Sequence, residues 1–363
     1  MAISKILHIS QPEVSRLLIA AQKAGWLGLP QFTAVDPETW QAAQERFFST
    51  TDLRDALRER HAQGGRQLHR VTVLSTGPDG HIGPATVAIF RTLLGDAGSV
   101  GVTWGNTLSR ITDALRQLGR ETPWRERTVK VVFVPLCGEP LINGGDPSTH
   151  SSSVLAMRLS EIFNSSNDAG LVPSIAGVQA FIPLKFGKRA EVDTIRRFIG
   201  VVRGHARVFG STEARADGPP PLAETLDAIL TSVGRADSDR RGIFLTERVQ
   251  VGDITDADME RCVAGDIGGV IIPNAGISKE DTRHIAQMND NWTGVRLDHL
   301  RRCADAARTN GFVRKKPGVI LLALGAHRLK VVLRCIELGL VNELVIDKDL
   351  EGALRGQVLS DPT

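Results

Sequence analysis

The chain has 363 residues, of which 42% are hydrophobic, and its 44 basic and 41 acidic side chains leave a formal net charge of +3. A chain of this length can bury a large core and is expected to hold more than one domain. The small net charge excludes a protein that binds polyanions over its whole surface. No apolar run approaches the roughly 20 residues of a membrane span and no signal peptide is legible, so a cytoplasmic protein is expected.

The N-terminal residues have the pattern of a helix-turn-helix unit. Residues 3–10 are predicted to end one short helix, and residues 11–24 to form a second. Ser10 and Glu13 make a capping box at the start of the second helix, and Pro12 lies in its first turn, where a missing N–H costs nothing. The second helix of such a unit enters the major groove with its N-terminal residues on base edges. The predicted DNA contacts are therefore Ser10, Gln11, Pro12, Ser15 and Arg16.

Three regions are predicted along the chain. Residues 1–30 form the helix-turn-helix unit, which is expected to be partial because its usual first helix would precede Met1. An amphipathic helix pair that only mediates assembly is the alternative for this region. Residues 31–66 are a helical linker, and residues 67–358 form the main domain. Because helix-turn-helix proteins bind two half-sites, a homo-oligomer, either a dimer or a tetramer, is expected.

The main domain alternates short apolar runs with segments of helical periodicity. Buried strands are predicted at residues 70–75, 99–103, 129–134, 177–182, 319–324 and 342–346. Helices are predicted at residues 85–94, 108–118, 154–163, 192–202, 222–230 and 329–338. This alternation is typical of an α/β fold with a doubly wound parallel sheet. Residues 204–221 and 233–242 are expected to be surface loops or excursions from the body.

Ligands of such sheets bind beyond the carboxyl ends of the strands. The strongest candidate is the turn at residues 101–109, where Gly105 lets the backbone approach an anion and Thr107 offers a hydroxyl. The free N–H groups at the start of the following helix attract negative charge, so a phosphate or a polyol fits; an ordinary connecting turn is equally consistent. Weaker candidates are residues 135–138, the turn at 265–269 with Asp266, and residues 325–328 with Arg328, for which plain loops are favoured.

Metals and cofactors are not expected. The four cysteines, Cys137, Cys262, Cys303 and Cys335, lie far apart and have no histidine at zinc spacing. They are typical of buried thiols in a reducing compartment. Neither G-x-G-x-x-G after a strand nor G-x-x-x-x-G-K-[ST] is present, so neither a dinucleotide nor a P-loop nucleotide site is indicated.

Taken together, these segments resemble the SorC-type family of sugar-binding transcriptional regulators over nearly the whole chain. Residues 9–18 resemble the family's recognition helix, and residues 99–108 its strand-and-turn signature, which is the most specific segment. Residues 264–268 are similar to a short glycine-and-aspartate motif, and residues 325–328 with 340–347 resemble the closing βαβ unit. The resemblance implies a large domain similar to sugar-phosphate isomerases and deaminases that serves as an effector sensor.

Residue by residue, the resemblance implies that the effector is held by Gly105, Asn106, Thr107, Leu108, Gly138, Asp266 and Arg328. Asp266 would meet sugar hydroxyls and Arg328 a phosphate. Arg328 stands where the family more often has lysine, which keeps the charge but changes the hydrogen-bond geometry. Some members are said to hold an aldehyde through a lysine beside the pocket glycines; because Leu136 and Cys137 precede Gly138 here, no Schiff base is expected.

Two functions follow. The favoured one is a transcriptional regulator without catalytic residues, whose binding to double-stranded operator DNA is controlled by a sugar or sugar phosphate. The alternative is a sugar-phosphate isomerase or deaminase that would need a base, for which the available groups are Asp266, His150 and Glu139. Their spacing does not indicate a catalytic arrangement.

Overall fold

The computed structural model describes residues 50–74, 82, 85–94, 96–121, 130–140, 151–164, 172–187, 189–210 and 219–359, together with Arg16. The chain divides into two units, Met1–Phe47 and Phe48–Thr363. In the first, Arg16 is helical and exposed. The other predicted DNA contacts, Ser10, Gln11, Pro12 and Ser15, lie outside the described residues and stay predictions.

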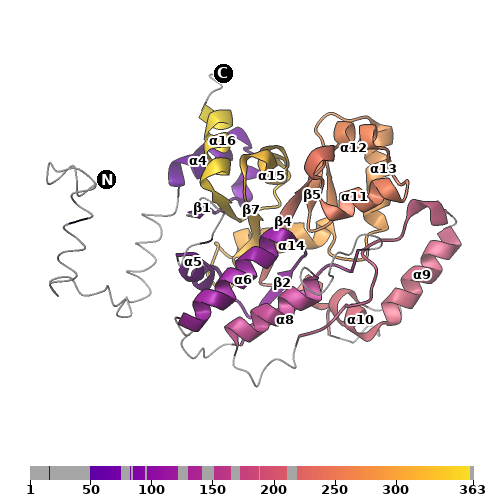
Figure 1. Cartoon of the computed structure of the whole chain (residues 1–363), viewed down its shortest axis with the longest axis horizontal. Coiled ribbons are helices and arrows are strands. Elements are labelled where there is room, and N and C mark those ends of the chain that lie inside the picture. Colours follow the sequence, from indigo (N-terminus) through magenta and orange to yellow (C-terminus); the bar gives the residue numbers. More distant parts are fainter. Residues whose placement is uncertain are drawn as a thin grey trace. The chain divides into compact units, whose positions relative to one another are not determined.

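The second unit is built on a central sheet (Figure 1). Six strands run parallel in the order β1-β8-β7-β4-β2-β3, and β5 and β6 extend the carboxyl end of β4 as an antiparallel hairpin. The strand bounds are β1 Arg70–Leu74, β2 Ser99–Val102, β3 Val132–Pro135, β4 Ala228–Arg235, β5 Val263–Ile267, β6 Val270–Pro273, β7 Gly318–Ala323 and β8 Glu343–Asp347. The α/β class and the parallel sheet predicted from the sequence are confirmed.

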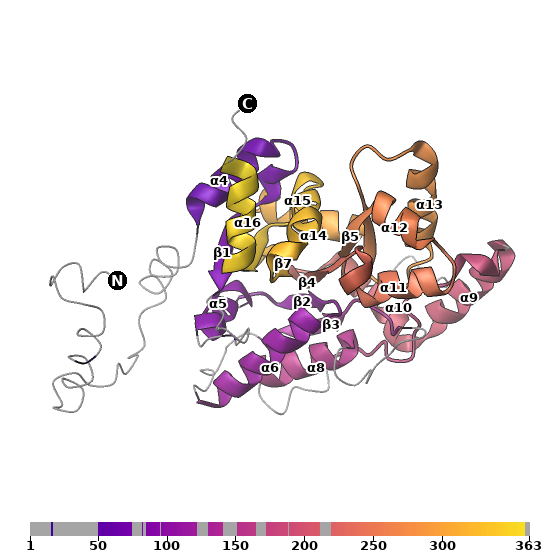
Figure 2. The same cartoon turned by 45° about the horizontal axis from the view of Figure 1, so that its top comes forward.

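Helices cover both faces of this sheet (Figures 1 and 2). One face carries α5 Ala85–Leu94, α6 Asn106–Glu121 and α8 Ser152–Phe163; the other carries α4 Thr51–Arg60, α14 Leu297–Thr309, α15 Leu329–Glu337 and α16 Lys348–Leu359. The remaining described helices are α9 Arg189–Val201, α10 Arg203–Phe209, α11 Ile243–Gln250, α12 Asp256–Cys262 and α13 Lys279–Asp290.

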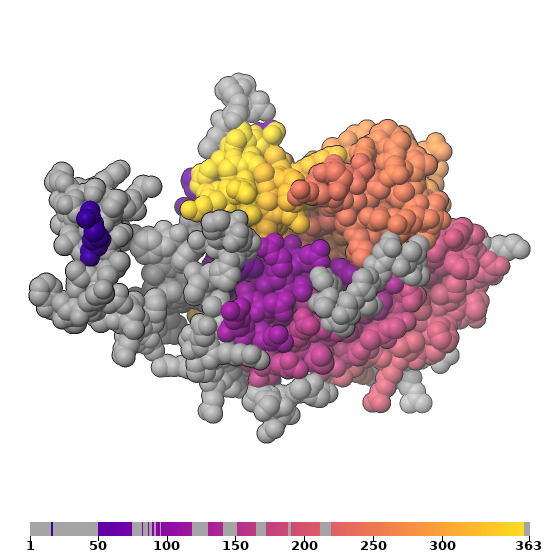
Figure 3. All heavy atoms as spheres, in the orientation of Figure 1, coloured from indigo at the N-terminus to yellow at the C-terminus, as the bar shows by residue number. Residues whose placement is uncertain are grey.

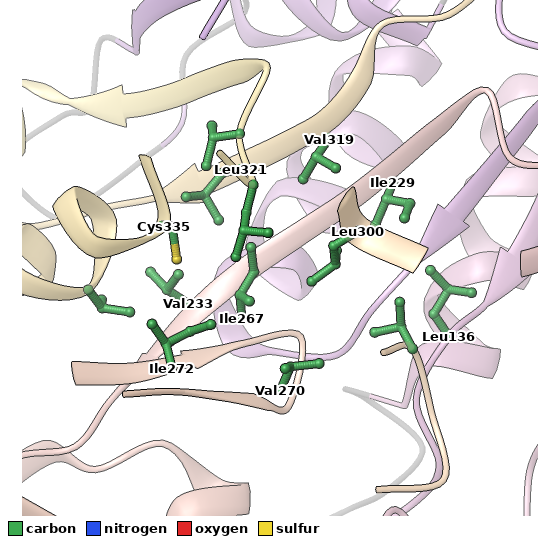
Figure 4. Close-up of a cluster of buried hydrophobic side chains, with 14 of the residues drawn as sticks. Leu136, Ile229, Val233, Ile267, Val270, Ile272, Leu300, Val319, Leu321 and Cys335 are labelled. Atoms are coloured by element: carbon green, nitrogen blue, oxygen red, sulfur yellow. The ribbon is translucent and has the colours of Figure 1, made fainter. Parts of the chain in front are cut away.

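Alternate residues of the strands enter two separate cores, because successive side chains of a strand point to opposite faces. Along β7, Val319 and Leu321 join one core, and Ile320 and Leu322 join the other. In the first of these cores, side chains from β4 and β7 pack with residues of β5 and β6 and with Leu300 of α14 (Figure 4). Two buried faces explain why β7 is apolar without interruption, as expected of a parallel strand.

The helix predicted at residues 222–230 is wrong. A short 3₁₀ turn, Leu222–Glu224, precedes β4, which occupies the centre of the sheet between β2 and β7. The Asp227 carboxylate accepts hydrogen bonds of 3.0 Å from the backbone N–H groups of Gly98 and Ser99, which fastens the start of β4 to the start of β2. The expected loop at 233–242 therefore begins as the end of this strand. The apolar spacing of 222–230 fits a helix, and pairing with two neighbouring strands overrides it.

The strand predicted at residues 177–182 is also wrong. Gln179 and Phe181 form only isolated bridges, one to Glu139 and one to Trp292. The run is nevertheless apolar because Val178, Ala180 and Phe181 are buried in the first core. Among the described helices, none combines the length and apolar character needed to cross a membrane.

The turn between β5 and β6 depends on two glycines that have left-handed backbones. Gly268 has φ +58° and Gly269 has φ +89°. A Cβ on Gly268 would lie 2.7 Å from Cγ2 of Thr103, and one on Gly269 would lie 2.0 Å from Cζ2 of Trp292. Only glycine allows this approach of the turn to the end of β2.

Gly269→Ala is therefore expected to destabilise the protein by about 3 kcal/mol or more, because a backbone penalty adds to overpacking against the indole. Gly276→Ala is the matched control: Gly276 also has a positive φ, +71°, but no atom lies within 4 Å of its Cβ position. The free energy of unfolding of that variant should decrease by only about 1–2 kcal/mol. Denaturant unfolding of both variants measures the difference, and equal losses would show that the turn is not packed as described.

Candidate functional site

The site lies at the carboxyl edge of the parallel sheet and begins with the turn after β2. Gly105 has φ +139°, and a Cβ there would lie 2.8 Å from Oγ of Ser232 on β4. The glycine thus brings the start of α6 against the neighbouring strand. Asn106 is exposed, whereas Thr107 is 6% exposed and Leu108 is fully buried in the core. Leu108 anchors the helix, so it could meet an effector only through its backbone.

The hairpin turn covers the same strand ends. The Gly268 N–H donates to the Ser232 carbonyl oxygen at 3.1 Å, and the Cys137 thiol donates to the Gly268 carbonyl oxygen at 3.2 Å. Beneath it, the hydroxyls of Thr103 and Thr231 are hydrogen-bonded at 3.0 Å and buried. These contacts bring together the turn at 101–109, the loop after β3 and the turn at 265–269.

Asp266 is the buried carboxyl group of this site. Its Oδ1 accepts the Gly269 N–H at 2.9 Å, and its Oδ2 lies against Gly234 and Gly242, where Cβ atoms would approach it to 2.0 and 3.1 Å. Burial raises the pKa of Asp266 to about 6, although the hydrogen bond from Gly269 acts in the opposite direction. At neutral pH the group is mostly a carboxylate in a confined space, which is suited to accepting hydrogen bonds from hydroxyl groups.

Gly138 has a structural reason to be glycine. A Cβ there would lie 2.5 Å from the Val178 carbonyl oxygen and 2.8 Å from the carbonyl group of Gln179. The adjacent Glu139 exchanges backbone hydrogen bonds of 2.7 Å with Val178 and Ala180. This packing accounts for the glycine without a ligand, and contact with an effector stays a prediction.

Arg328 lies after β7, in the 3₁₀ turn Ala326–Arg328. Its guanidinium donates to the Leu324 carbonyl oxygen and, at 2.7 Å, to Nε2 of His327, and its Nε is buried without a partner among the described residues. Burial lowers the pKa of Arg328; Asp347 opposes this decrease, whereas Arg235 and Arg110 add to it.

Two further arginines, Arg235 and Arg110, therefore lie near Arg328 at this edge of the sheet. Arg235 extends from the end of β4, where Asp237 and Asp239 bind it at 2.7 and 3.2 Å, and Arg110 belongs to the second turn of α6. The pKa of His327 is lowered by burial and by Arg328, Arg235 and Arg240. Such a group of positive charges near the N-terminus of α6 would attract a phosphate.

The sequence interpretation missed Arg235 because β4 was not recognised as a strand. Arg110 and His327 were not singled out either, although Arg110 directly follows the candidate turn at 101–109 and His327 lies within the candidate segment 325–328. In Figure 3 the surfaces of the α6–α8 region and of the C-terminal third of the chain adjoin each other. Residues far apart in the sequence thus contribute to one edge.

The groups considered for an enzyme do not form a catalytic pair in the described residues. Glu139 accepts a hydrogen bond of 2.7 Å from the Ser151 hydroxyl, and burial raises its pKa. His150 lies outside the described residues. Burial raises the pKa of the Cys137 thiol far above its ordinary value, so it is not an activated nucleophile. Within the described part of the chain, no group of three or more histidine, cysteine or acidic side chains could hold a metal ion.

Asp266→Asn is expected to change the pH dependence of stability. Because the folded pKa of about 6 exceeds the ordinary 3.8, Asp266 favours the folded state at low pH and this contribution is lost as pH rises between these values. Between pH 3.5 and pH 7, the free energy of unfolding of the wild type should decrease by about 3 kcal/mol relative to that of the variant. The amide oxygen of the variant can still accept the Gly269 N–H. Urea unfolding at both pH values measures this, with exposed Asp290→Asn as a control that should match wild type. If the free energy of unfolding changes between the two pH values by the same amount in Asp266→Asn as in the wild type, this carboxyl is not buried as described.

No protein-family model matches the chain, and no curated protein matches it. Solved structures do. A domain assigned as the sugar-binding domain of a transcriptional repressor from Vibrio fischeri has a TM-score of 0.53 and 13% identity, covering 85% of this chain and 100% of that one. A DeoR family transcriptional regulator from Listeria monocytogenes has a TM-score of 0.52 and 16% identity, covering 84% and 99%.

A domain from Arthrobacter aurescens TC1, of a regulator assigned to sugar binding, has a TM-score of 0.51 and 20% identity, covering 86% of this chain and 98% of that one. At these identities the likeness concerns the fold. The second unit of this chain therefore shares the fold of these three domains.

Proposed function

We propose that the chain is a transcriptional regulator whose binding to operator DNA is controlled by a sugar or sugar phosphate. The observation that carries this is the meeting, at one sheet edge, of the Gly105 turn, the Asp266 carboxylate and the cations around Arg328. A carboxylate that accepts hydrogen bonds and a cationic group that binds an anion are complementary to the two ends of a phosphorylated sugar. The fold adds support, since the three solved domains named above come from transcriptional regulators.

In this proposal the effector's phosphate lies at the start of α6, near Arg328, Arg235 and Arg110, and its hydroxyls face Asp266 and Asn106. Thr107 offers its hydroxyl from the first turn of the helix. Gly138 and Leu108 would contribute only backbone. No cofactor enters the proposal, because binding alone can shift an equilibrium between two conformations that differ in DNA affinity.

The N-terminal residues would supply the DNA contacts in the proposal. Gln11 to Arg16 begin the predicted recognition helix, and in a homo-oligomer two such helices would be held at the separation of two half-sites. Effector binding in the main domain would change that separation. Such a regulator would act in the cytoplasm on double-stranded DNA.

An isomerase or deaminase is the second candidate. Two acidic side chains, Glu139 and Asp266, both raise the pKa of the Cys137 thiol and so lie in its vicinity. Turnover assays with ketose and aldose phosphates and their amino derivatives test it. Product formation that is lost in Asp266→Asn would favour the enzyme over the regulator.

Sugar phosphates are expected to raise the melting temperature of the full chain. A ligand at a hundredfold excess over its Kd stabilises by about 2.7 kcal/mol. Arg328→Gln should lose most of this ligand-dependent increase, and Arg328→Lys should retain part of it because the charge remains. Arg314→Gln is the control, since Arg314 pairs with Asp96 at the surface. A thermal-shift screen of sugars and their phosphates measures the effect, and an equal response of Arg328→Gln and wild type would remove Arg328 from the site.

Arg16→Ala is expected to weaken specific DNA binding by about 1–3 kcal/mol if Arg16 reads a base. Gel-shift titration with the DNA upstream of the chain's own operon, with and without the sugar phosphate found by thermal shift, measures this. Arg283→Ala removes an exposed arginine of α13 and should bind as wild type does. The absence of a sequence-specific shift under every condition would count against the regulator.

A further inference from the structure

A cavity lies between α9, α10 and the start of α14. Its volume is about 540 Å³, which is within the range of small-molecule sites. The apolar part of its lining includes Ile182, Ile199 and Phe209. None of the residues predicted to hold the effector belongs to this lining, so the cavity is distinct from the site already described.

His299 supplies a hydrogen-bond donor to this cavity. The side chain is part of the lining and is 9% exposed. Its Nδ1 accepts the backbone N–H of Arg296 at 3.2 Å, which places the ring proton on Nε2. Burial lowers the pKa of His299, so the ring is neutral. Among the described residues, Nε2 has no hydrogen-bond partner, so its N–H is available to a ligand in the cavity.

The other charged groups of the lining differ in whether they are already paired. Glu224 pairs with Arg302 at 3.2 Å, and Arg196 donates to the Asp290 carbonyl oxygen and to Asn291 at 2.8 and 3.1 Å. Arg296 and Asp298 are exposed at the start of α14, and neither has an ion pair with another described residue.

Arg296 is the residue that precedes α14, and His299 lies in the first turn of that helix. Their donors and the free N–H groups of the helix start can converge on one anionic group, and a carboxylate accepts from both. The apolar wall of Ile182, Ile199 and Phe209 can then cover a hydrophobic body. Asp298 would in addition favour an ammonium group next to the carboxylate.

We propose that this cavity binds a small carboxylic acid with an aromatic or branched apolar body, its carboxylate held by His299 Nε2–H and Arg296. The inference does not rest on the effector site, and Trp292 lies between the two. The indole is 3% exposed, lines this cavity, and packs on Phe244 with ring centroids 4.8 Å apart. It also packs against Gly269 of the turn that carries Asp266.

Isothermal titration calorimetry of the full chain tests the proposal. The probes are phenylpyruvate, L-phenylalanine and 4-methyl-2-oxopentanoate, with phenylethylamine as the analogue that lacks a carboxylate. At least one acid should bind saturably at concentrations up to about 5 mM, and the amine should bind more weakly than the acids. No saturable binding of any acid, or equal binding of the amine, overturns the proposal.

Two variants then locate the bound acid. His299→Asn keeps an acceptor near the position of Nδ1 for the Arg296 N–H but lacks the Nε2 donor, and Arg296→Gln removes the guanidinium from an exposed position. Each should raise the Kd by about tenfold or more. Arg301→Gln, on the same helix but outside the lining, should keep the wild-type Kd. If His299→Asn does not fold, Arg296→Gln decides alone, and a wild-type Kd in the folded variants places the acid elsewhere and overturns the proposal.

Discussion

The contact of the Gly268–Gly269 turn with the carboxyl ends of β2 and β4 is the constraint on which the edge of the sheet depends. The turn lies so close to Thr103 and Trp292 that neither glycine could carry a Cβ without displacing a neighbour. It holds Asp266 beside Gly234 and brings the carbonyl oxygen of Gly268 to the Cys137 thiol. Without this approach, the loops after β2, β3 and β4 would remain separate turns and would not form one site.

Two acidic side chains, Asp266 and Glu343, are buried in different parts of the sheet. Asp266 and Glu343 are both buried carboxyls whose pKa values are raised, to about 6 and about 7, mainly because water is excluded from them. Glu343 has Arg70 at 3.7 Å but its Oε2 has no hydrogen-bond partner among the described residues, and Asp266 accepts the Gly269 N–H. An incompletely compensated carboxylate costs stability, and such costs are commonly retained at binding sites. Position separates the two groups: Asp266 lies at the carboxyl edge of the sheet, whereas Glu343 lies at the start of β8 opposite Arg70 of β1.

Much of the main domain could be predicted from its sequence, because β1, β2, β7 and β8 are short apolar runs separated by helices of clear period, and α5 has the predicted bounds. The failures have local causes. Leu222, Leu226 and Leu230 are spaced as in a helix, yet Leu230 belongs to β4 and pairs with Ile320 of β7. Val178, Ala180 and Phe181 are apolar because loops bury them, although they belong to no strand. Apolar spacing reports burial, and the partner that causes the burial decides the secondary structure.

The sequence by itself determined the α/β class, the glycine turn at Gly105 and the acidic and cationic residues Asp266 and Arg328, because each depends on local backbone preference or on side-chain chemistry. Only the tertiary structure decided that Arg235 and Arg110 lie near Arg328 and that Gly138 packs against the Val178 carbonyl oxygen. It also decided that His299 lines the cavity between α9, α10 and α14. Those relations join residues distant along the chain, and they arise from strand order and the packing of helices on two faces, which no local pattern encodes.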